Sequence, residues 1–581
     1  MKKINPAVAL LVLSASMLIG CASHGESISA ASSASSSAAS SVSNASDEVG
    51  YAAGRNVFDN YMKADKIWKT EAYVDAGETF MPSRGKSKLL VVPVVFSDDT
   101  STDTELEDNR EAMRKAFFGE ATETSWQSVH SYYYQSSYHQ LDIQGEVAKT
   151  IKADKTFTDY TTSKLTAIVN ILAEELFDKL FTADTAQYKG KTADFDSNGD
   201  GVVDGIYFIS NNAISSSTDL GWAFTTHHYF TTSRAKYTGA RFSAFGTYAW
   251  SSINFMTRTA SERASLATPD AHTYIHEMGH QLGLNDYYDP NTQGSEKAGG
   301  STMQDENICD HDGYSKYLWG WATPQVVTDK NTEASLTITL KPSESSGDGL
   351  VLTSDFNGTA LDEYLYIEYY TPTGLNAHDV AKSYEGKDQQ GVNESGIRVW
   401  HVDKNILQAH MGKTKNDKGA TVDTAYFDPN PVKTLYTNGA DQDYSFPDDI
   451  APEDDNLHTS DDMTNQDDDF YTSYTTNNSK DYSDATTATQ NFFVSPELQI
   501  VRAKSSGSAV IDSAALFKQG STFGTENDAS KDFSFYSPAV VLDYNCSGTD
   551  WDNAAKIKLP YSFTVTSLTD DAATLTLTKL A

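Results

Sequence analysis

Two histidines four positions apart, His276 and His280, have the spacing that points most directly to chemistry in this sequence. On a helix, positions i and i+4 lie on one face, so the two imidazoles can bind a single metal ion. Glu277 then points beside the metal, where its carboxylate can act as a general base on water that zinc activates. The pattern therefore predicts a zinc site with Glu277 as its catalytic residue.

A third zinc ligand is expected shortly after this helix. Gly283 can end or sharply turn the helix, and Asp286 follows three residues later. Two histidines and one carboxylate leave the fourth position of a tetrahedral zinc open to water, which is typical of catalytic rather than structural sites. We predict Asp286 as the ligand because Gly283 makes its approach simple, while Asp289 and Asp310 stay as alternatives.

A second group of oxygen-bearing residues has the spacing of a calcium loop, with Gly201 at its turn. The candidate ligands, at loop positions 1, 3, 5 and 9, are Asp196, Asn198, Asp200 and Asp204. Tyr207 stands at position 12, where a standard EF-hand has a bidentate Glu, so Asp194 or a remote carboxylate would have to complete the shell. The sequence favours Ca²⁺ here over the alternative, an acidic turn that leads into a strand and needs no ion.

The elements that must position these residues can be read from hydrophobic periodicity. The unbroken apolar run Leu89–Phe96 predicts a strand covered on both faces, and it marks the start of the folded part. Apolar residues at helical spacing between 165 and 176 predict an amphipathic helix. Further elements are expected at 105–118 (helix), 128–134 (helix), 141–145 (strand) and 206–209 (strand).

From about residue 336 the periodicity changes from helical to alternating, which indicates strands. Strands are expected at 336–340, 364–369, 396–403, 563–566 and 574–578. We therefore predict an α+β domain at 87–330, followed by a β-rich, sandwich-like region at 331–581. Within that region, residues 441–484 form an acidic, polar tract without an apolar face, which is best read as a loop.

The N-terminus has the features of an export signal, predicted at 1–20. Lys2 and Lys3 precede an apolar run, Ala7–Ile19, that is too short to span a bilayer permanently. Cys21 follows in a context that resembles the lipobox of bacterial lipoproteins, which predicts lipidation at Cys21; the alternative is an ordinary signal peptide with a fortuitous Cys. A Ser- and Ala-rich tether at 21–48 and a lead segment at 49–86 come next.

Composition limits the partners. The chain has 44 Lys and Arg against 80 Asp and Glu, a formal net charge of −36, so nucleic acid and anionic lipid headgroups would repel it. Besides Cys21, the only cysteines are Cys309 and Cys546, so a disulfide framework is excluded, although one bridge between these two stays open. Membrane contact is expected through a lipid anchor only.

The segment from Ile275 to Asp289 resembles the active-site signature of the immune inhibitor A family of bacterial zinc metallopeptidases, HExGHxLGLxDxYD. Every fixed position of that pattern is matched, and the resemblance covers most of the chain between about 85 and 405. It includes the helix and strand at 128–145, the segment 310–321, Glu368 and the stretch 399–403. The resemblance implies that 87–330 is a zincin-like metallopeptidase domain.

Two residues near the zinc helix keep two interpretations each. Met303 lies where zinc peptidases resembling the metzincins place a methionine turn, but it could also be an ordinary core residue. His272 lies one turn before His276 and could hydrogen-bond to the zinc ligands or face solvent.

These features together predict a lipid-anchored zinc endopeptidase at the bacterial cell surface or envelope, acting on a protein or glycoprotein substrate. Zn²⁺ is the expected cofactor, with Ca²⁺ as a second ion. The alternative is a non-catalytic surface adhesin or glycan-binding lipoprotein that keeps the peptidase fold. It is less favoured because the zinc ligands and the catalytic carboxylate of Glu277 are all present.

Overall fold

The computed structural model describes the chain in segments from Gly50 to Leu580, all of which belong to one compact unit, Ser46–Ala581. The described residues are 50–51, 81–161, 172–197, 203–214, 219–227, 247–257, 265–284, 286–287, 298–354, 356, 358, 360, 363–382, 391–403, 408–415, 421–428, 498–504, 510–524, 535–536, 556–557 and 559–580. The predicted export signal, the tether with Cys21, most of the lead segment, the acidic tract at 441–484 and Cys546 lie outside these residues.

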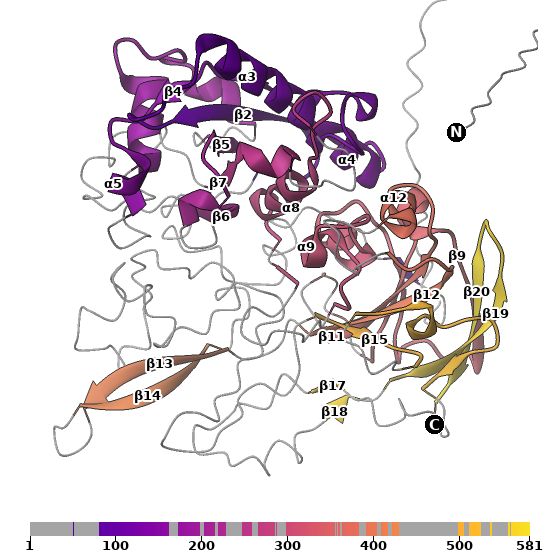
Figure 1. Cartoon of the computed structure of the whole chain (residues 1–581). Coiled ribbons are helices and arrows are strands. Elements are labelled where there is room, and N and C mark those ends of the chain that lie inside the picture. The colour runs from indigo at the N-terminus through magenta and orange to yellow at the C-terminus, as the bar shows by residue number, and fades with distance from the viewer. Residues whose placement is uncertain are drawn as a thin grey trace, which may run out of the picture. The chain divides into compact units, whose positions relative to one another are not determined.

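The fold is mixed α/β with several sheets, which is compatible with the predicted α+β class (Figure 1). The first sheet has the strand order β3-β2-β5-β7-β6, with β4 also paired to β2. Strands β3, β2, β5 and β7 run parallel, and β6 lies antiparallel to β7 at the edge. The strands are β2 (Gly85–Val95), β3 (Leu141–Val147), β4 (Ile151–Lys152), β5 (Ile206–Ser210), β6 (Phe224–His227) and β7 (Thr247–Ser252).

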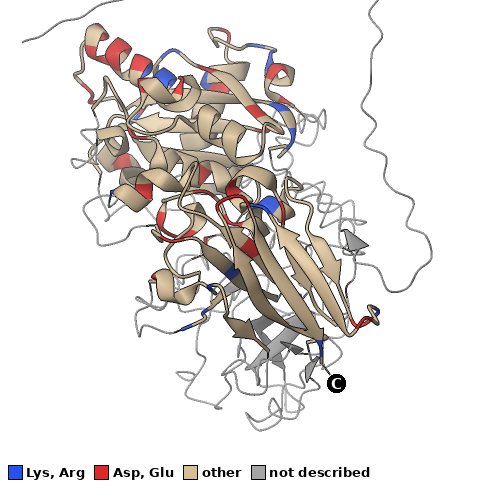
Figure 2. Cartoon of the chain, turned by 90° about the vertical axis from the view of Figure 1, so that its right-hand side faces the viewer, with Lys and Arg blue, Asp and Glu red and all other residues tan. Residues whose placement is uncertain are grey.

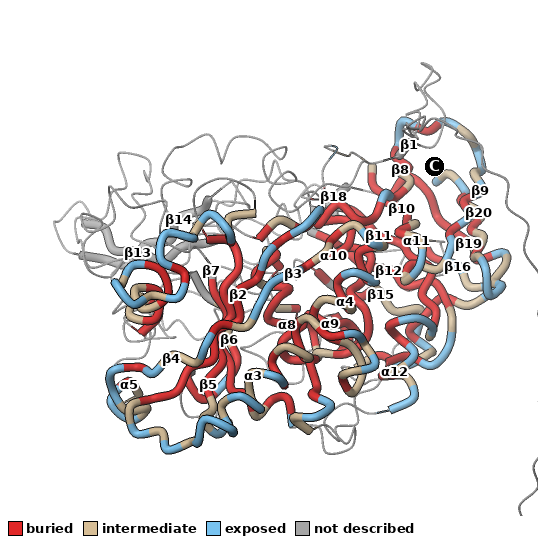
Figure 3. The backbone as a smooth tube through the Cα atoms, turned by 90° about the horizontal axis from the view of Figure 1, so that it is seen from above, coloured by how far each residue is buried: buried red, intermediate tan, exposed pale blue. Residues whose placement is uncertain are grey.

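Strand β2 is buried on both faces, as its unbroken apolar run predicts. Side chains alternate across a strand, and accordingly Leu89 and Val91 enter one core cluster while Leu90 and Val92 enter another. Figure 3 shows β2, β5 and β7 coloured as buried along most of their length. Burial on both faces places this sheet in the centre of its part of the fold.

Three helices cover the face of the first sheet to which Leu89 points, namely α3 (Asp103–Phe118), α4 (Val129–Ser136) and α8 (His272–Gln281). A capping box of Thr102 and Glu105 begins α3. Shorter helical elements are α5 (Phe157–Thr161), η1 (Ala121–Glu123), η2 (Asp178–Thr182), η3 (Thr192–Phe195), η4 (Asp219–Gly221) and η6 (Ile253–Thr257). On this face α8 contacts β6 and β7, which places the His276 helix next to the sheet edge.

A second sheet has the order β1-β8-β10-β11-β12-β15, and a third the order β16-β19-β20-β9. The strands are β1 (Gly50–Tyr51), β8 (Gln325–Val327), β9 (Ser335–Leu340), β10 (Leu350–Leu352), β11 (Glu363–Tyr370), β12 (Gly396–Asp403), β15 (Leu498–Val501), β16 (Thr522–Phe523), β19 (Tyr561–Leu568) and β20 (Ala573–Lys579). Residues of both sheets share one apolar core, which includes Ile367, Val399, Phe563 and Leu575.

The remaining elements that the structure describes are two strand pairs and five short helices. They are the paired strands β13 (Gln408–Lys415) and β14 (Thr421–Asp428), the pair β17 (Phe535–Tyr536) and β18 (Lys556–Ile557), and the helices α9 (Met303–Glu306), α10 (Gly313–Leu318), α11 (Ser343–Ser346), α12 (Asn376–Ala381) and η11 (Ser513–Ala515). In the part of the chain that the structure describes, no helix is both long and apolar enough to cross a membrane.

A buried charged contact ties the second sheet to α10. Glu368 on β11 accepts hydrogen bonds from Arg398 Nε and Trp400 Nε1, both at 2.7 Å, and from the backbone N–H of Gly313 at 3.0 Å. Burial opposes the charge on Glu368, but the Arg398 guanidinium outweighs it and lowers the pKa of this carboxyl. Because Gly313 begins α10, this contact fixes the start of that helix against the sheet.

Acidic residues are spread over the part of the chain that the structure describes. Aspartates and glutamates occur on helices and on connecting loops rather than in one segment, with lysines and arginines interspersed (Figure 2). This distribution agrees with the excess of 80 acidic over 44 basic residues in the whole sequence.

Candidate metal centre

Helix α8 presents the two predicted zinc ligands on one face. Asp270 begins it by accepting the backbone N–H of His272 at 2.9 Å, since Ala271 at the N-cap has no side-chain acceptor. The helix ends at Gln281, and Gly283 adopts a left-handed conformation with φ of 95°. The N–H of Leu284 then bonds back to the carbonyl of Gly279 at 3.0 Å, and this turn brings Asp286 towards the helix.

The three predicted zinc ligands converge on one point. Asp286 Oδ1 lies 2.8 Å from His276 Nε2 and 3.2 Å from His280 Nε2, and the two Nε2 atoms are 3.2 Å apart. Zinc–ligand bonds of about 2.0–2.1 Å in a tetrahedral shell imply ligand atoms about 3.3 Å apart. His276, His280 and Asp286 therefore have the donor atoms and the spacing of a zinc site.

Hydrogen bonds on the far side of each imidazole orient these ligands. His276 Nδ1 lies 3.0 Å from the carbonyl oxygen of Met303, and His280 Nδ1 lies 2.8 Å from that of Leu284. A carbonyl oxygen only accepts, so each Nδ1 carries a proton, and each Nε2 is directed towards the other ring and towards Asp286. The close approach of these three donor atoms favours a cation between them, and a divalent metal fits this position.

The charges in the cluster agree with this requirement. Burial lowers the pKa of His280, but the adjoining Asp286 carboxylate outweighs it and raises this pKa to about 9. Burial would raise the pKa of Asp286, and the two histidines instead hold it well below its usual range. The cluster thus favours positive charge at its centre, which a proton or a divalent metal ion can supply.

Glu277 lies beside the three ligand atoms rather than among them. Its side chain is buried, and its Oε2 accepts a hydrogen bond of 2.7 Å from Thr225 Oγ1 on the edge strand β6. Burial raises the pKa of Glu277 above its ordinary value, against the opposing effect of His280 and His276. A carboxylate with a raised pKa next to a metal site can accept and return a proton near neutral pH.

The alternatives for the third ligand have different outcomes. Asp310 is buried in an ion pair with Lys316, at 2.5 Å between Oδ2 and Nζ, and accepts a hydrogen bond from Ser136. It lies outside the group formed by the two histidines, which Asp286 joins. Asp289 lies outside the described residues. Of the two candidates that the structure describes, Asp286 is the one brought to the histidines.

Met303 contacts the site through its backbone. Its carbonyl oxygen receives the hydrogen bond from His276, while its side chain is fully buried in the core cluster that includes Met278. A supporting role of its thioether for the metal stays a prediction.

Sequence reasoning missed two residues at this site. Thr225, which contacts Glu277, lies in a strand without any motif. Gln304 is fully buried against α8, where its Nε2 donates to the carbonyl of His276 at 3.3 Å. A Cβ added at Gly279 would lie 2.1 Å from Gln304 Oε1, so the glycine inside the HExxH helix makes room for this contact. Gly279 was the only feature of the sequence that pointed to this contact of Gln304.

Half of the predicted calcium ligands are described. Asp204 is buried and accepts a hydrogen bond from the backbone N–H of Ser197, while Asp196 is half-buried. This hydrogen bond joins the two described ends of the acidic segment before β5. Asn198 and Asp200 lie outside the described residues, so binding of Ca²⁺ stays a prediction.

His272 points away from the predicted zinc ligands and contacts Asp270 and Asp379 instead.

Comparison of the chain with models of known protein families and with curated proteins found no match. The residues of the site are therefore the basis for its function.

Proposed function

We propose that this protein is a zinc-dependent endopeptidase whose metal is held by His276, His280 and Asp286. The observation that carries the proposal is the convergence of these three donor atoms, with the carboxylate of Glu277 next to them but outside the ligand set. Two histidines and one carboxylate are the ligands of catalytic zinc sites that keep one position open.

In this mechanism Glu277 moves the protons. Bound zinc supplies Lewis acidity, which lowers the pKa of water and polarises a peptide carbonyl. Glu277 takes the proton of the attacking water and passes it to the leaving amine. Thr225 fixes the rotation of the carboxylate by donating to its Oε2, and the burial of Glu277 raises its pKa towards the range in which both transfers work.

Two further features support a peptidase. The signature from His276 to Asp289 resembles that of the immune inhibitor A family. In addition, α8 lies next to β6, an antiparallel edge strand of an otherwise parallel sheet, and an edge strand can pair with an extended peptide. We propose accordingly that residues 87–330 form a zincin-like domain and that the strands after 331 form a sandwich-like β-rich region.

We propose that the protein is exported and lipid-anchored through Cys21 at the cell surface or envelope, where protein or glycoprotein substrates would be accessible. The sequence at Lys2, Lys3 and Ala7–Cys21 supports this location. A Cys21→Ser variant should move the chain from the membrane fraction to the soluble fraction. Retention of that variant in the membrane fraction would contradict the anchor.

The function is tested by zinc content and casein cleavage of the purified chain beside a Glu277→Gln variant. The variant should keep its zinc and lose about 10²–10⁴-fold in cleavage rate, because general-base catalysis contributes that much. Glu107→Gln, at an exposed position of α3, is the matched control and should cleave like the wild type. Undiminished cleavage by Glu277→Gln would overturn the mechanism. Zinc binding without cleavage of any substrate by the wild type would favour the adhesin alternative.

A further inference from the structure

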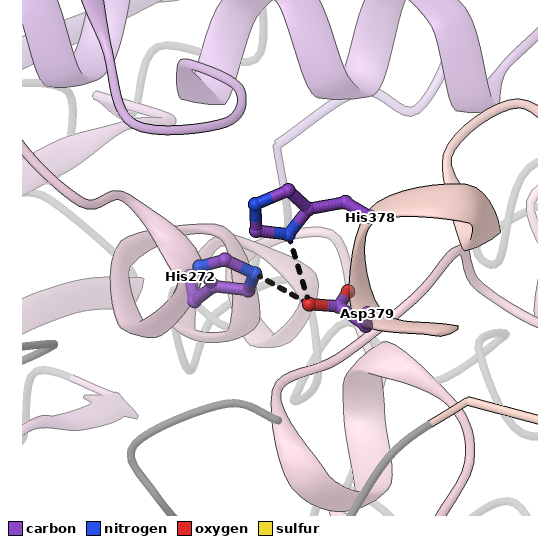
Figure 4. Close-up of side chains that lie close together, drawn as sticks. All are labelled: His272, His378 and Asp379. Atoms are coloured by element: carbon purple, nitrogen blue, oxygen red, sulfur yellow. Dashed lines mark hydrogen bonds and ion pairs between the residues drawn. The ribbon is translucent and has the colours of Figure 1, made fainter. Parts of the chain in front are cut away.

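A second cluster of metal-binding side chains lies at the other end of α8 (Figure 4). It joins His272, the first residue of α8, to His378 and Asp379 of α12. Asp379 Oδ1 lies 3.3 Å from His272 Nε2 and 3.1 Å from His378 Nδ1. Figure 4 shows both rings directed at this one oxygen atom.

The geometry matches that of the catalytic candidate. Both clusters offer two imidazole nitrogens and one carboxylate oxygen, with all three ligand atoms within 4.8 Å of one another. The separations of 3.1 and 3.3 Å are close to the distance between ligands of a tetrahedral zinc, about 3.3 Å for bonds of about 2.0–2.1 Å.

Contacts behind these atoms orient them towards a shared centre. Asp270 Oδ1 lies 2.6 Å from His272 Nδ1, and Asp270 is itself buried. A carboxylate on the far nitrogen of a histidine is the usual support of a metal ligand, because it keeps the proton there and frees Nε2 for the metal. Asp379 uses its other oxygen, Oδ2, to accept the backbone N–H of Cys309 at 2.6 Å, which leaves Oδ1 to the two histidines.

The rings are also held in place by an aromatic side chain. Trp126 stacks on His272 with ring centroids 4.4 Å apart and on His378 with centroids 5.4 Å apart, at interplanar angles of 17° and 19°. One indole thus packs against both imidazoles, and their planes are set before any ion binds.

Charge requires a cation at this point. The side chains of Asp270 and Asp379 are each only 1% exposed, and two buried carboxylates beside one imidazole are costly without positive charge. Two occupants meet this need. One is a proton that makes His272 an imidazolium between two carboxylates, and the other is a divalent metal ion, for which the second imidazole, that of His378, supplies a further ligand.

We propose that His272, His378 and Asp379 form a second metal site, separate from the catalytic one, for a divalent transition-metal ion. The nitrogen-rich donor set suits zinc and disfavours Ca²⁺ and Mg²⁺, which prefer oxygen ligands. The side chain of His378 is 15% exposed, so water can complete the shell. The ion links α12 to the first residue of α8 and thereby fixes the helix that carries His276 and His280.

The test is metal stoichiometry of the full chain after chelation and reloading with Zn²⁺ alone. The wild type should bind two zinc ions per chain, whereas His378→Gln and His280→Gln should each bind one. His130→Gln, at a partly exposed histidine of α4 that lies outside both clusters, is the matched control and should bind two. The same zinc content in His378→Gln as in the wild type would overturn the inference.

The two sites can fail independently. One zinc per wild-type chain that is lost in His280→Gln but kept in His378→Gln would mean that His272 holds a proton, and the second site would be refuted while the proposed function stands. One zinc per wild-type chain that is lost in His378→Gln but kept in His280→Gln would mean that only the second site binds zinc. The proposed function would then be refuted while the second site stands. Zinc K-edge absorption of His280→Gln gives a result even if His378→Gln fails to fold, because its remaining zinc should show two imidazole ligands.

A structural role predicts a separate readout. Excess zinc over apoprotein should raise the melting temperature of His280→Gln through the second site, and this rise should be absent in the His280→Gln/His378→Gln double variant. The single variant His378→Gln should melt at a lower temperature than the wild type. If zinc raises the melting temperature of His280→Gln and of His280→Gln/His378→Gln equally, the second site is contradicted.

Discussion

Thr225 Oγ1 lies 2.7 Å from Glu277 Oε2, so the edge strand β6 directly fixes the carboxylate that we propose as the catalytic base. The same hydroxyl is 3.0 Å from the backbone carbonyl of Glu277. One threonine therefore connects the sheet edge to both the side chain and the main chain of this residue. Thr225 thereby links β6, where an extended substrate would pair, to the Glu277 carboxylate, which would move the proton.

A Thr225→Val variant should test this link, because valine keeps the shape and removes the donor. Loss of one hydrogen bond to a charged group costs about 1.5–3 kcal/mol, so kcat should fall about 10–100-fold while zinc content stays unchanged. The hydrogen bond from Thr225 lowers the pKa of Glu277, and its loss should move the acid limb of the kcat/KM profile to higher pH. Thr337→Val, at an exposed position of β9, is the control. An unchanged pH profile would count against a positioning role.

The identity of the third zinc ligand is tested by two aspartate variants. Asp286→Ala should lower zinc affinity at least 10-fold, since it removes a ligand atom that lies 2.8 Å from His276 Nε2. Asp310→Ala should keep the zinc but lower the free energy of unfolding by about 3–5 kcal/mol, because the side chain of Lys316 would be left buried without its partner. Equilibrium dialysis and urea unfolding measure the two effects, and loss of catalytic zinc in Asp310→Ala alone would reverse the assignment.

Gly279 should be intolerant of the smallest side chain. Alanine improves helix propensity by about 1 kcal/mol, but its Cβ would lie 2.1 Å from Gln304 Oε1 in a fully buried contact. Overpacking of this kind costs about 1–3 kcal/mol, so Gly279→Ala should lower the free energy of unfolding measured in urea. Combining it with Gln304→Ala should cost less than the sum of the two single changes. Strict additivity in that double-mutant cycle would show that the clash is relieved elsewhere.

His401 on β12 should make stability depend on pH. Burial lowers its pKa from 6.5 to about 3 in the folded chain, so this residue stays neutral there while it gains a proton in the unfolded chain below pH 6.5. The contribution of His401 to the free energy of unfolding is therefore fully present above pH 6.5 and is lost as pH falls towards 3. The loss is about 2 kcal/mol between pH 8 and pH 5.

The contribution of His401 is isolated by comparison with His401→Gln. The difference in the free energy of unfolding between the wild type and this variant should shrink by that amount over the same pH interval, because other titrating groups cancel. His139→Gln, at an exposed position, should leave the pH dependence as in the wild type. Parallel pH curves for the wild type and His401→Gln would refute the prediction.

Removal of zinc should abolish activity while leaving the secondary structure largely unchanged. Chelation should abolish casein cleavage, and added Zn²⁺ should restore it in the wild type but not in His276→Ala, which lacks a ligand. The far-ultraviolet circular dichroism should change little, because α8 is also held by the apolar core, which contains its residues Tyr274, Ile275 and Met278. Cleavage that persists after complete zinc removal would contradict a zinc-dependent mechanism.

Several features of this chain could be predicted from the sequence because they depend on short-range geometry. The i, i+4 spacing predicted that His276 and His280 share one face of a helix, and the turn at Gly283 predicted the approach of Asp286. The apolar run of β2 predicted a strand buried on both faces, and alternation predicted β11, β12, β19 and β20. Each of these is decided by residues within a few positions of one another.

Other features were decided only by the tertiary structure. Thr225 and Glu277 are 52 positions apart, and His272 meets Asp379 across a still longer separation. Asp310 was a candidate ligand by residue type, yet Lys316 and Ser136 take its carboxylate. Such pairings depend on which apolar faces pack together, and periodicity shows that a face is buried without showing what it is buried against. The ligand helix could therefore be predicted from the chain, whereas the residues that orient its base and join it to α12 could not.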